Sequence, residues 1–258
     1  MRKKLTALLI TYNEEDLIQG VLENISFADE IIVVDSFSTD RTIEIVKRFK
    51  NVKLIRRAFN NFTDQREFAI SKASNKWLFF LDADELTSEN LKNEILNELE
   101  NPGDIVAYGV KRNFYFKKKL IRFSGYQTHI VYRLFNKDYC YYDRRKKVHE
   151  TLIFQGKTKI LKNKLDHFSY KDEMSFKKKL TKYAQLRAEE LFEKHKKPNL
   201  YHFYVKPLYR FVNQYFIRLG FLDGKEGYKI SKLNAFEVKQ RYLILKKMIK
   251  HKSENNII

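Results

Sequence analysis

The chain has 258 residues, 43% of them hydrophobic and 15% aromatic, enough for one large packed domain or a domain with an appendage. No run of 18 uncharged apolar residues occurs and Cys140 is the only cysteine, which excludes an evident transmembrane helix and an intrachain disulfide framework and suits a reducing cytoplasm. The net charge of +19 is uneven: residues 1–104 carry 14 Lys and Arg against 19 Asp and Glu, and the remainder carries 37 against 13. The second part therefore suits an anionic partner such as a nucleic acid, a membrane surface or a phosphorylated acceptor.

Apolar strands and amphipathic helices alternate over the first 110 residues. The basic start and the short apolar run after it resemble a signal peptide, but no small-residue cleavage site follows, so we interpret the run as the first strand. Apolar residues recur at helical spacing in each segment between two expected strands, and again in the segment after the fourth strand. This alternation predicts an α/β domain with a doubly wound, mainly parallel sheet. The expected strands are residues 5–11, 30–35, 52–57 and 76–82.

The pattern changes after residue 104, where β-type segments such as "DIVAYGVKRNFYF" and "HIVYRLFNK" follow. Residues 147–170 read as short strands with a turn at Gln155-Gly156. From residue 171 the chain is predominantly helical, and three helical segments are expected, near residues 172–196, 200–219 and 226–250. We therefore expect one domain, residues 1–170, built from halves 1–104 and 105–170, followed by a basic helical region, residues 171–258.

Three carboxylates follow the apolar run of "NKWLFFLDADELT", at Asp82, Asp84 and Glu85. Carboxylates massed at a strand end repel one another, and a hard divalent cation with oxygen ligands is their natural complement. The alternative is a polar loop leading into the next helix. In a parallel sheet ligands bind beyond the carboxyl ends of the strands, so Thr11-Tyr12-Asn13 and Asp35-Ser36 should lie along the same edge. No Gly-rich phosphate loop is present, so a phosphate-bearing ligand would have to be held by a metal.

The segments "LLITYNEE", "EIIVVDSFSTDRT" and "FFLDADE" resemble, in order and spacing, the inverting family-two glycosyltransferases, which have the GT-A nucleotide-diphospho-sugar transferase fold. "VHE", ending at residue 150, "HFSY" at 167–170 and "GFLDGKEG" from residue 220 are similar to the subgroup of lipopolysaccharide-core β-1,4-glucosyltransferases. The resemblance implies that residues 1–104 bind the nucleotide sugar and residues 105–170 the acceptor. It further implies a GT-A catalytic domain with a helical C-terminal extension.

By this resemblance, Mg²⁺ or Mn²⁺ bridges the donor diphosphate and offsets its growing negative charge. The DXD motif supplies Asp84 as a metal ligand, whereas Asp82 contacts the ribose side and, through water, the metal. Asp35 reads the uracil edge, although a turn or capping role is its alternative. The expected nucleotide-sugar pocket is completed by Thr11, Tyr12, Asn13, Glu14 and, as a looser match, Arg66.

An inverting displacement needs a base to take the proton of the acceptor hydroxyl. The resemblance assigns this role to Glu150, with Asp143 as the fallback. His149 orients Glu150, binds a phosphate or is structural. His167 has the same structural alternative, and we assign it no catalytic role. Many relatives carry an acidic "ED" pair where this chain has "HE", so the assignment of the base is the first to fail if the analogy fails.

These features predict a glycosyltransferase that moves a hexose, in the first instance glucose, from a UDP-sugar to a lipid-linked, lipopolysaccharide or other bacterial surface-glycan acceptor. A nucleotidyltransferase is one alternative, but the N-terminus lacks the Gly-rich basic loop that grips a triphosphate. A nucleic-acid-binding protein is the other, since basic and aromatic residues alternate in "YCYYDRRKK". The acidic strand ends would repel a phosphate backbone, so we expect no nucleic-acid partner.

The second helical segment carries an apolar stripe at Tyr204, Leu208, Phe211, Tyr215 and Leu219. Two interpretations stay open: the helix packs on the catalytic domain, or it docks on an anionic membrane surface. The expected location is accordingly the cytoplasm, with peripheral association at the inner face of the cell membrane as the second possibility.

Overall fold

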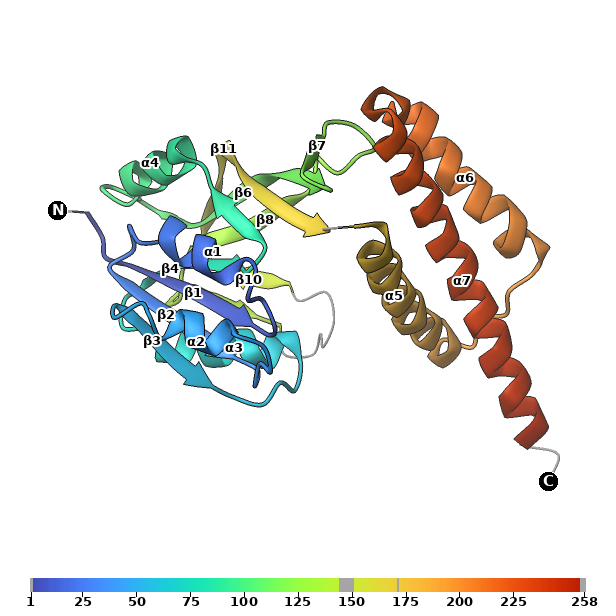
Figure 1. Ribbon diagram of the computed structural model, residues 1–258, viewed down its shortest axis with the longest axis horizontal. Coiled ribbons are helices and arrows are strands. Elements are labelled where there is room, and N and C mark those ends of the chain that lie inside the picture. Colours follow the sequence, from blue (N-terminus) through green and yellow to red (C-terminus); the bar gives the residue numbers. More distant parts are fainter. Residues whose placement is uncertain (1, 144–150, 171, 256–258) are drawn as a thin grey trace. The chain divides into compact units, whose positions relative to one another are not determined.

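The computed structural model describes residues 2–143, 151–170 and 172–255, and the side chains of these as far as residue 252 (Figure 1). The chain divides into two compact units. Unit 1 comprises Met1–Arg112 and Thr128–His167, and unit 2 comprises Asn113–Gln127 and Phe168–Ile258. Two long strands, β6 (Ile105–Phe116) and β11 (Lys157–Tyr170), each contribute residues to both units.

The first half of the unit 1 sheet is parallel, as predicted. Its strands lie in the order β3-β2-β1-β4, and each is followed in the chain by a helix or by a short strand and a helix. The strands predicted from apolar runs are confirmed, because every interior position of β1 and β2 is buried or nearly so. The four strands are β1 (Leu5–Thr11), β2 (Glu30–Asp35), β3 (Val52–Arg56) and β4 (Trp77–Asp82). The helices are α1 (Ile18–Asn24), α2 (Thr42–Val46), α3 (Phe62–Lys72) and α4 (Glu89–Glu98).

The second half of the sheet continues as β8-β6-β11-β5, and β8 is antiparallel to both β4 and β6. Of the expected short strands of residues 147–170, residues 147–150 lie outside the described residues. Residues 151–170 contain β10 and a single long strand, β11, with a bend at Gln155 and Gly156 between them. The remaining strands are β5 (Glu85–Thr87), β7 (Lys119–Ile121), β8 (Ile130–Asn136), β9 (Cys140–Tyr142) and β10 (Leu152–Phe154). β7 extends β6 as a hairpin, and β9 pairs with β10 as a separate two-stranded sheet.

Alternate residues of the parallel strands face two different cores, which is the pattern of a sheet covered on both faces. Leu9, Val33 and Phe79 face one core, which α1, α2 and α4 complete. Leu8 and Phe80 face the other, which α3 and the β9–β10 pair complete. The parallel pairing of β1 with β2 and β4 places the carboxyl ends of these three strands side by side.

Unit 2 is mainly helical, and its three helical segments match those predicted. Asp172 and Ser175 form a reciprocal capping box at the start of α5. The long helix α7 packs against both α5 and α6 (Figure 1). No helix among the described residues is both long and apolar enough to cross a membrane. The elements are α5 (Glu173–Glu193), the π-helical turn η1 (Tyr201–Val205), α6 (Lys206–Val212), a second π-helical turn η2 (Asn213–Ile217), the 3-10 turn η3 (Gly220–Asp223) and α7 (Lys225–Asn255).

The segment "GFLDGKEG" has a structural explanation within unit 2. Asp223 is buried, and its two carboxylate oxygens accept hydrogen bonds from the backbone N–H groups of Arg122 (2.8 Å) and Phe123 (2.9 Å). A Cβ atom at Gly227 would lie 1.9 Å from the carbonyl oxygen of Gly220, so the two backbones approach too closely for a side chain. The segment therefore joins the loop after β7 to the start of α7.

Candidate active site

The sheet places three predicted site residues at one edge. Thr11, the last residue of β1, is in register with Asp35 at the end of β2, and Ile10 is in register with Asp82 at the end of β4. Parallel strands align their carboxyl ends, so this juxtaposition follows from the topology.

Hydrogen bonds join the loop after β1 to the loop after β2. Asn13 has a left-handed backbone (φ 56°), its N–H donates to Ser38 Oγ (2.9 Å), and its Oδ1 accepts from the N–H of Thr39 (2.8 Å). The N–H of Glu14 donates to Thr42 Oγ1 (2.8 Å). These bonds fix the backbone beside Tyr12, whose side chain is 56% exposed and therefore open to a ligand.

Thr11 and Asp35 lie beneath this loop and differ in their partners. Thr11 Oγ1 is buried and has no hydrogen-bond partner among the described residues. Asp35 is completely buried, and its carboxylate accepts both the N–H (2.9 Å) and the hydroxyl of Ser38. Asp35 thus has the geometry of the turn-capping alternative. If Asp35 also bound the edge of a uracil ring, the base would have to donate to carboxylate lone pairs that Ser38 does not use.

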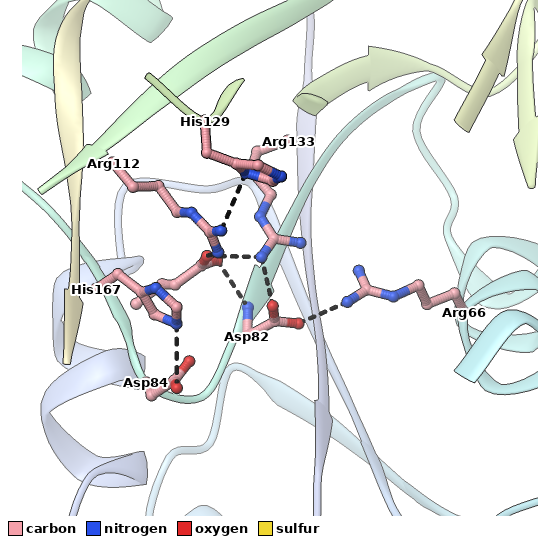
Figure 2. Close-up of polar contacts among 8 residues, drawn as sticks. Arg66, Asp82, Asp84, Arg112, His129, Arg133 and His167 are labelled. Atoms are coloured by element: carbon pink, nitrogen blue, oxygen red, sulfur yellow. Dashed lines mark hydrogen bonds and ion pairs between the residues drawn. The ribbon is translucent and has the colours of Figure 1, made fainter. Parts of the chain in front are cut away.

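Asp82 lies between two arginines (Figure 2). Arg66 Nη2 donates to Asp82 Oδ1 (2.7 Å), and Arg133 Nη2 donates to Asp82 Oδ2. Burial alone would raise the pKa of the Asp82 carboxyl, but the charges of Arg133 and Arg66 outweigh it and hold the pKa well below its usual range. Asp82 therefore stays ionised, and Arg66, which was assigned to the nucleotide, contacts Asp82 in this structure.

Glu85 extends the same network. Its side chain is fully buried, Arg133 Nη2 donates to its Oε1 (2.6 Å), and Arg112 Nη1 lies 3.3 Å from the same oxygen. The backbone N–H of Asp82 donates to Glu85 Oε2 (3.1 Å). Arg112 also lies 3.2 Å from His129 Nδ1. The network neutralises the carboxylates of Asp82, at the end of β4, and Glu85, at the start of β5, and fixes their orientation.

Sequence reasoning missed Arg112 and Arg133 as members of this site. Arg133 stands within the apolar strand "IVYRLFN", and a charged residue flanked by buried strand positions indicates a buried partner. That signal predicts that Arg133 has a buried acidic partner, but it does not identify the residue, because β8 and β4 are adjacent only through the tertiary fold.

Asp84 lies directly beyond β4 and contacts a residue from the end of β11. His167 Nε2 is 3.3 Å from Asp84 Oδ2 (Figure 2). This distance is close to that between two neighbouring ligands of one ion, each about 2.1 Å from it. His167, which the sequence did not assign to the metal, thus supplies a nitrogen donor beside the predicted metal ligand.

The donor set fits a cation that takes most of its ligands from elsewhere. No group of three or more His, Cys, Asp and Glu side chains in the described part of the chain is arranged to hold a metal. One carboxylate and one imidazole leave most positions of a six-coordinate Mg²⁺ or Mn²⁺ to phosphate oxygens and water. The residues present therefore fit a metal that arrives with a diphosphate.

The predicted bases Glu150 and His149 lie outside the described residues. Asp143 follows β9, and its backbone N–H donates to the carbonyl of Thr151 (3.2 Å). It is adjacent in the chain to Tyr142, whose ring lies 5.7 Å from the guanidinium carbon of Arg66. The fallback base is thus close in sequence to a residue that contacts the arginine network.

Comparison with known proteins identifies the class of enzyme. A family model described as glycosyl transferase family 2 matches residues 6–168. The chain is 30% identical over 260 residues to the lipopolysaccharide core biosynthesis glycosyltransferase LpsC of Rhizobium meliloti, covering 93% of each chain. It is 29% identical over 264 residues to an uncharacterized glycosyltransferase of Rickettsia typhi, covering 95% of this chain and 87% of the relative. The chain therefore belongs to glycosyl transferase family 2.

The predicted GT-A fold and enzyme class are confirmed by this membership, which does not favour the nucleic-acid-binding or nucleotidyltransferase alternatives. Among solved structures, the mannosyltransferase PcManGT from Pyrobaculum calidifontis, in complex with GDP-Man and Mn²⁺, is 26% identical, covers 43% of this chain and 36% of that chain, and has a TM-score of 0.39. Similarity at that score does not carry a donor or a metal over to this chain.

Proposed function

We propose that this glycosyltransferase moves a hexose, glucose in the first instance, from a UDP-sugar to a lipopolysaccharide or other bacterial surface-glycan acceptor. The observation that carries the proposal is the Asp84–His167 pair, which lies beside the arginine-bound Asp82 at the carboxyl edge of the sheet. The acceptor class is supported by the similarity to LpsC over nearly the whole chain.

In this proposal Asp84 and His167 hold Mg²⁺ or Mn²⁺, which when bound supplies positive charge to the leaving diphosphate. The buried hydroxyl of Thr11 and the exposed ring of Tyr12 offer a hydrogen bond and a stacking surface to the nucleotide. Asn13, Glu14 and Asp35 hold the loop that carries these groups, and Asp35 is assigned the uracil edge. Arg66 and Arg133 keep Asp82 ionised and oriented toward the ribose side.

The transfer is a single inverting displacement. The acceptor hydroxyl oxygen forms a bond to the anomeric carbon while the bond from that carbon to the diphosphate oxygen breaks. The hydroxyl proton passes to the carboxylate of Glu150, with Asp143 as the alternative base, and His149 orients Glu150. A lipid-linked acceptor would place this reaction at the inner face of the cell membrane.

The test is release of UDP from a panel of UDP-sugars, with and without Mn²⁺ or Mg²⁺. Wild type should turn over one sugar in a metal-dependent way, and Asp84→Ala should lose that turnover. Asp138→Ala, which removes a surface carboxylate paired with Lys76, is the matched control and should keep it. Turnover of no UDP-sugar, or full activity in Asp84→Ala, would contradict the proposal. A salt-sensitive gel shift would then test the nucleic-acid alternative.

A further inference from the structure

The helical segment of η1, α6 and η2 in unit 2 exposes large apolar side chains. Twelve of the twenty large hydrophobic side chains recorded as exposed in the described part of the chain fall between residues 200 and 228. Solvent-exposed apolar patches of this kind mark interaction sites in soluble proteins. Six of these side chains, each more than half exposed, define what we term the aromatic face: Tyr201, Tyr204, Leu208, Tyr209, Phe216 and Ile217.

The inward side of the same segment carries polar as well as apolar side chains. Gln214 is buried and its Nε2 donates to the carbonyl of Ser124 (3.3 Å), and Lys206 Nζ donates to the hydroxyl of Tyr242 in α7 (2.9 Å). A surface helix ordinarily directs its apolar stripe inward and its polar side chains to water. This segment does so only in part, and much of its apolar surface is left without cover within unit 2.

The charged residues in the chain segment that carries the aromatic face are all basic. Residues 194–222 contain six Lys and Arg and no Asp or Glu. The next acidic residue, Asp223, is buried on backbone N–H groups and presents no charge to a partner. Beside the face lies a pocket of about 630 Å³ whose lining includes Tyr215, Tyr228 and the lysines 177, 225, 229 and 232. One acidic residue, Glu173, also lines it and is paired with Lys229 (3.3 Å), so the lining keeps an excess of positive charge. The ring of Tyr215 lies 5.0 Å from that of Phe216, so this pocket adjoins the face.

We infer that the aromatic face docks on an anionic lipid surface, with the segment lying in the plane of the interface and the neighbouring lysines contacting phosphate headgroups. Tyrosine rings suit the boundary between acyl chains and headgroups, because one end of the ring is apolar and the other is polar. Basic residues near the surface add electrostatic attraction to anionic lipid. A second copy of the chain fits less well, because its net charge of +19 would oppose the approach.

This inference deepens the proposed function, on which it rests for the lipid-linked acceptor. Its test uses the full chain and vesicles of phosphatidylcholine, with and without phosphatidylglycerol, in a flotation assay. Wild type should bind the phosphatidylglycerol vesicles, and added salt should weaken binding. Leu208→Glu combined with Ile217→Glu should lower the partition coefficient at least tenfold, which corresponds to about 1.4 kcal/mol. Lys225→Gln with Lys232→Gln should lower binding to the anionic vesicles specifically.

Ile160→Glu is the matched control, because Ile160 is 47% exposed on β11 in unit 1 and lies outside both the aromatic face and the basic pocket, so binding should be unchanged. UDP release without vesicles should be equal in all variants, which separates this test from that of the transfer reaction. The inference is overturned if wild type binds no vesicles or if the Leu208→Glu, Ile217→Glu protein binds as well as wild type. A wild-type dimer that the same substitutions dissociate would assign the face to self-association instead.

Discussion

His167 Nε2 lies 3.3 Å from Asp84 Oδ2, although the two residues are far apart in the sequence. Asp84 sits in the turn after β4, whereas His167 is in β11, which pairs with the short strand β5 immediately beyond that turn. The register aligns His167 with Glu85, so the pairing of β11 with β5 determines the position of the imidazole. His167 can therefore contact a ligand bound by Asp84, although it lies outside residues 1–104, the half expected to bind the nucleotide.

If His167 shares a metal with Asp84, then His167→Ala should raise the Mn²⁺ concentration needed for half-maximal UDP release by at least about tenfold. A purely structural histidine would instead lower stability and leave the metal dependence of the remaining activity unchanged. The measurement is a metal titration of UDP release, with thermal unfolding recorded on the same protein. His251→Ala, which alters an exposed histidine of α7, should match wild type in both assays.

Arg133 should be a determinant of stability as well as of the site. Arg133→Met leaves Glu85 buried without its closest cation and removes one of the two arginines on Asp82. Breaking a buried ion pair on one side costs about 3–5 kcal/mol of unfolding free energy. Urea denaturation followed by the fluorescence of Trp77, the single tryptophan and a buried residue of β4, would measure the loss. The double variant Arg133→Met, Glu85→Gln should recover part of it, and no recovery would argue against the pairing.

The sequence predicted the parallel half of the fold and its ligand edge because those features depend on local periodicity and on a general rule of topology. Strands β1 and β2 begin and end at the expected residues, and Thr11, Asp35 and Asp82 lie at one edge. Arg112, Arg133 and His167 could not be assigned in the same way, because they lie on strands whose neighbours depend on long-range antiparallel pairing.

The predicted stripe of the second helical segment is only partly correct, for a reason that is also physical. Tyr204, Leu208 and Leu219 are exposed, whereas Phe211 and Tyr215 are half-buried against Tyr228 of α7. The π-helical turns η1 and η2 interrupt the period of 3.6 residues on which the stripe was constructed.

Asp35 offers a test that separates capping from nucleotide recognition. Ser38→Ala removes the hydroxyl that donates to Asp35 and accepts from the N–H of Asn13, but leaves the Asp35 carboxylate, whereas Asp35→Asn alters the carboxylate itself. If Asp35 only caps the turn, both variants should lose similar stability, about 0.5–2 kcal/mol, and bind UDP in proportion to the folded fraction. If Asp35 reads the uracil, Asp35→Asn should weaken UDP binding more than Ser38→Ala does. Calorimetric titration of UDP into folded protein distinguishes the two.

Glu94 should make the stability of unit 1 depend on pH. Its carboxylate ties α4 to β11 by accepting the backbone N–H groups of Lys162 (2.7 Å) and Asn163 (2.9 Å). Burial alone would raise the pKa of Glu94, but these hydrogen bonds outweigh it and lower the pKa below the ordinary value of 4.5. The unfolded state therefore binds the proton first, and the stabilisation present above about pH 4.5 is lost as the pH falls toward the folded-state pKa.

The expected result is that Glu94→Gln is less stable than wild type near pH 6 and that the difference narrows toward pH 3. Urea midpoints followed by Trp77 fluorescence at several pH values would measure it. Parallel curves for the two proteins would show that the carboxylate contributes no pH dependence.

Gly227 should be essential to the junction between the β7 loop and α7. In Gly227→Ala the new Cβ would lie 1.9 Å from the carbonyl oxygen of Gly220, and backbone atoms cannot yield as the end of a flexible side chain can. We expect a loss of at least about 1–3 kcal/mol from this overpacking. Gly20→Ala is the control, because a Cβ at Gly20 in α1 meets nothing within 4 Å, so the substitution should be neutral or stabilise the helix by about 0.5–1 kcal/mol.

Hydrogen exchange should show faster exchange in residues 122–125 and the first turns of α7 in Gly227→Ala, with the protection of β1 and β4 unchanged. Equal protection of α7 in wild type and Gly227→Ala would mean that the glycine contact does not hold unit 2 together.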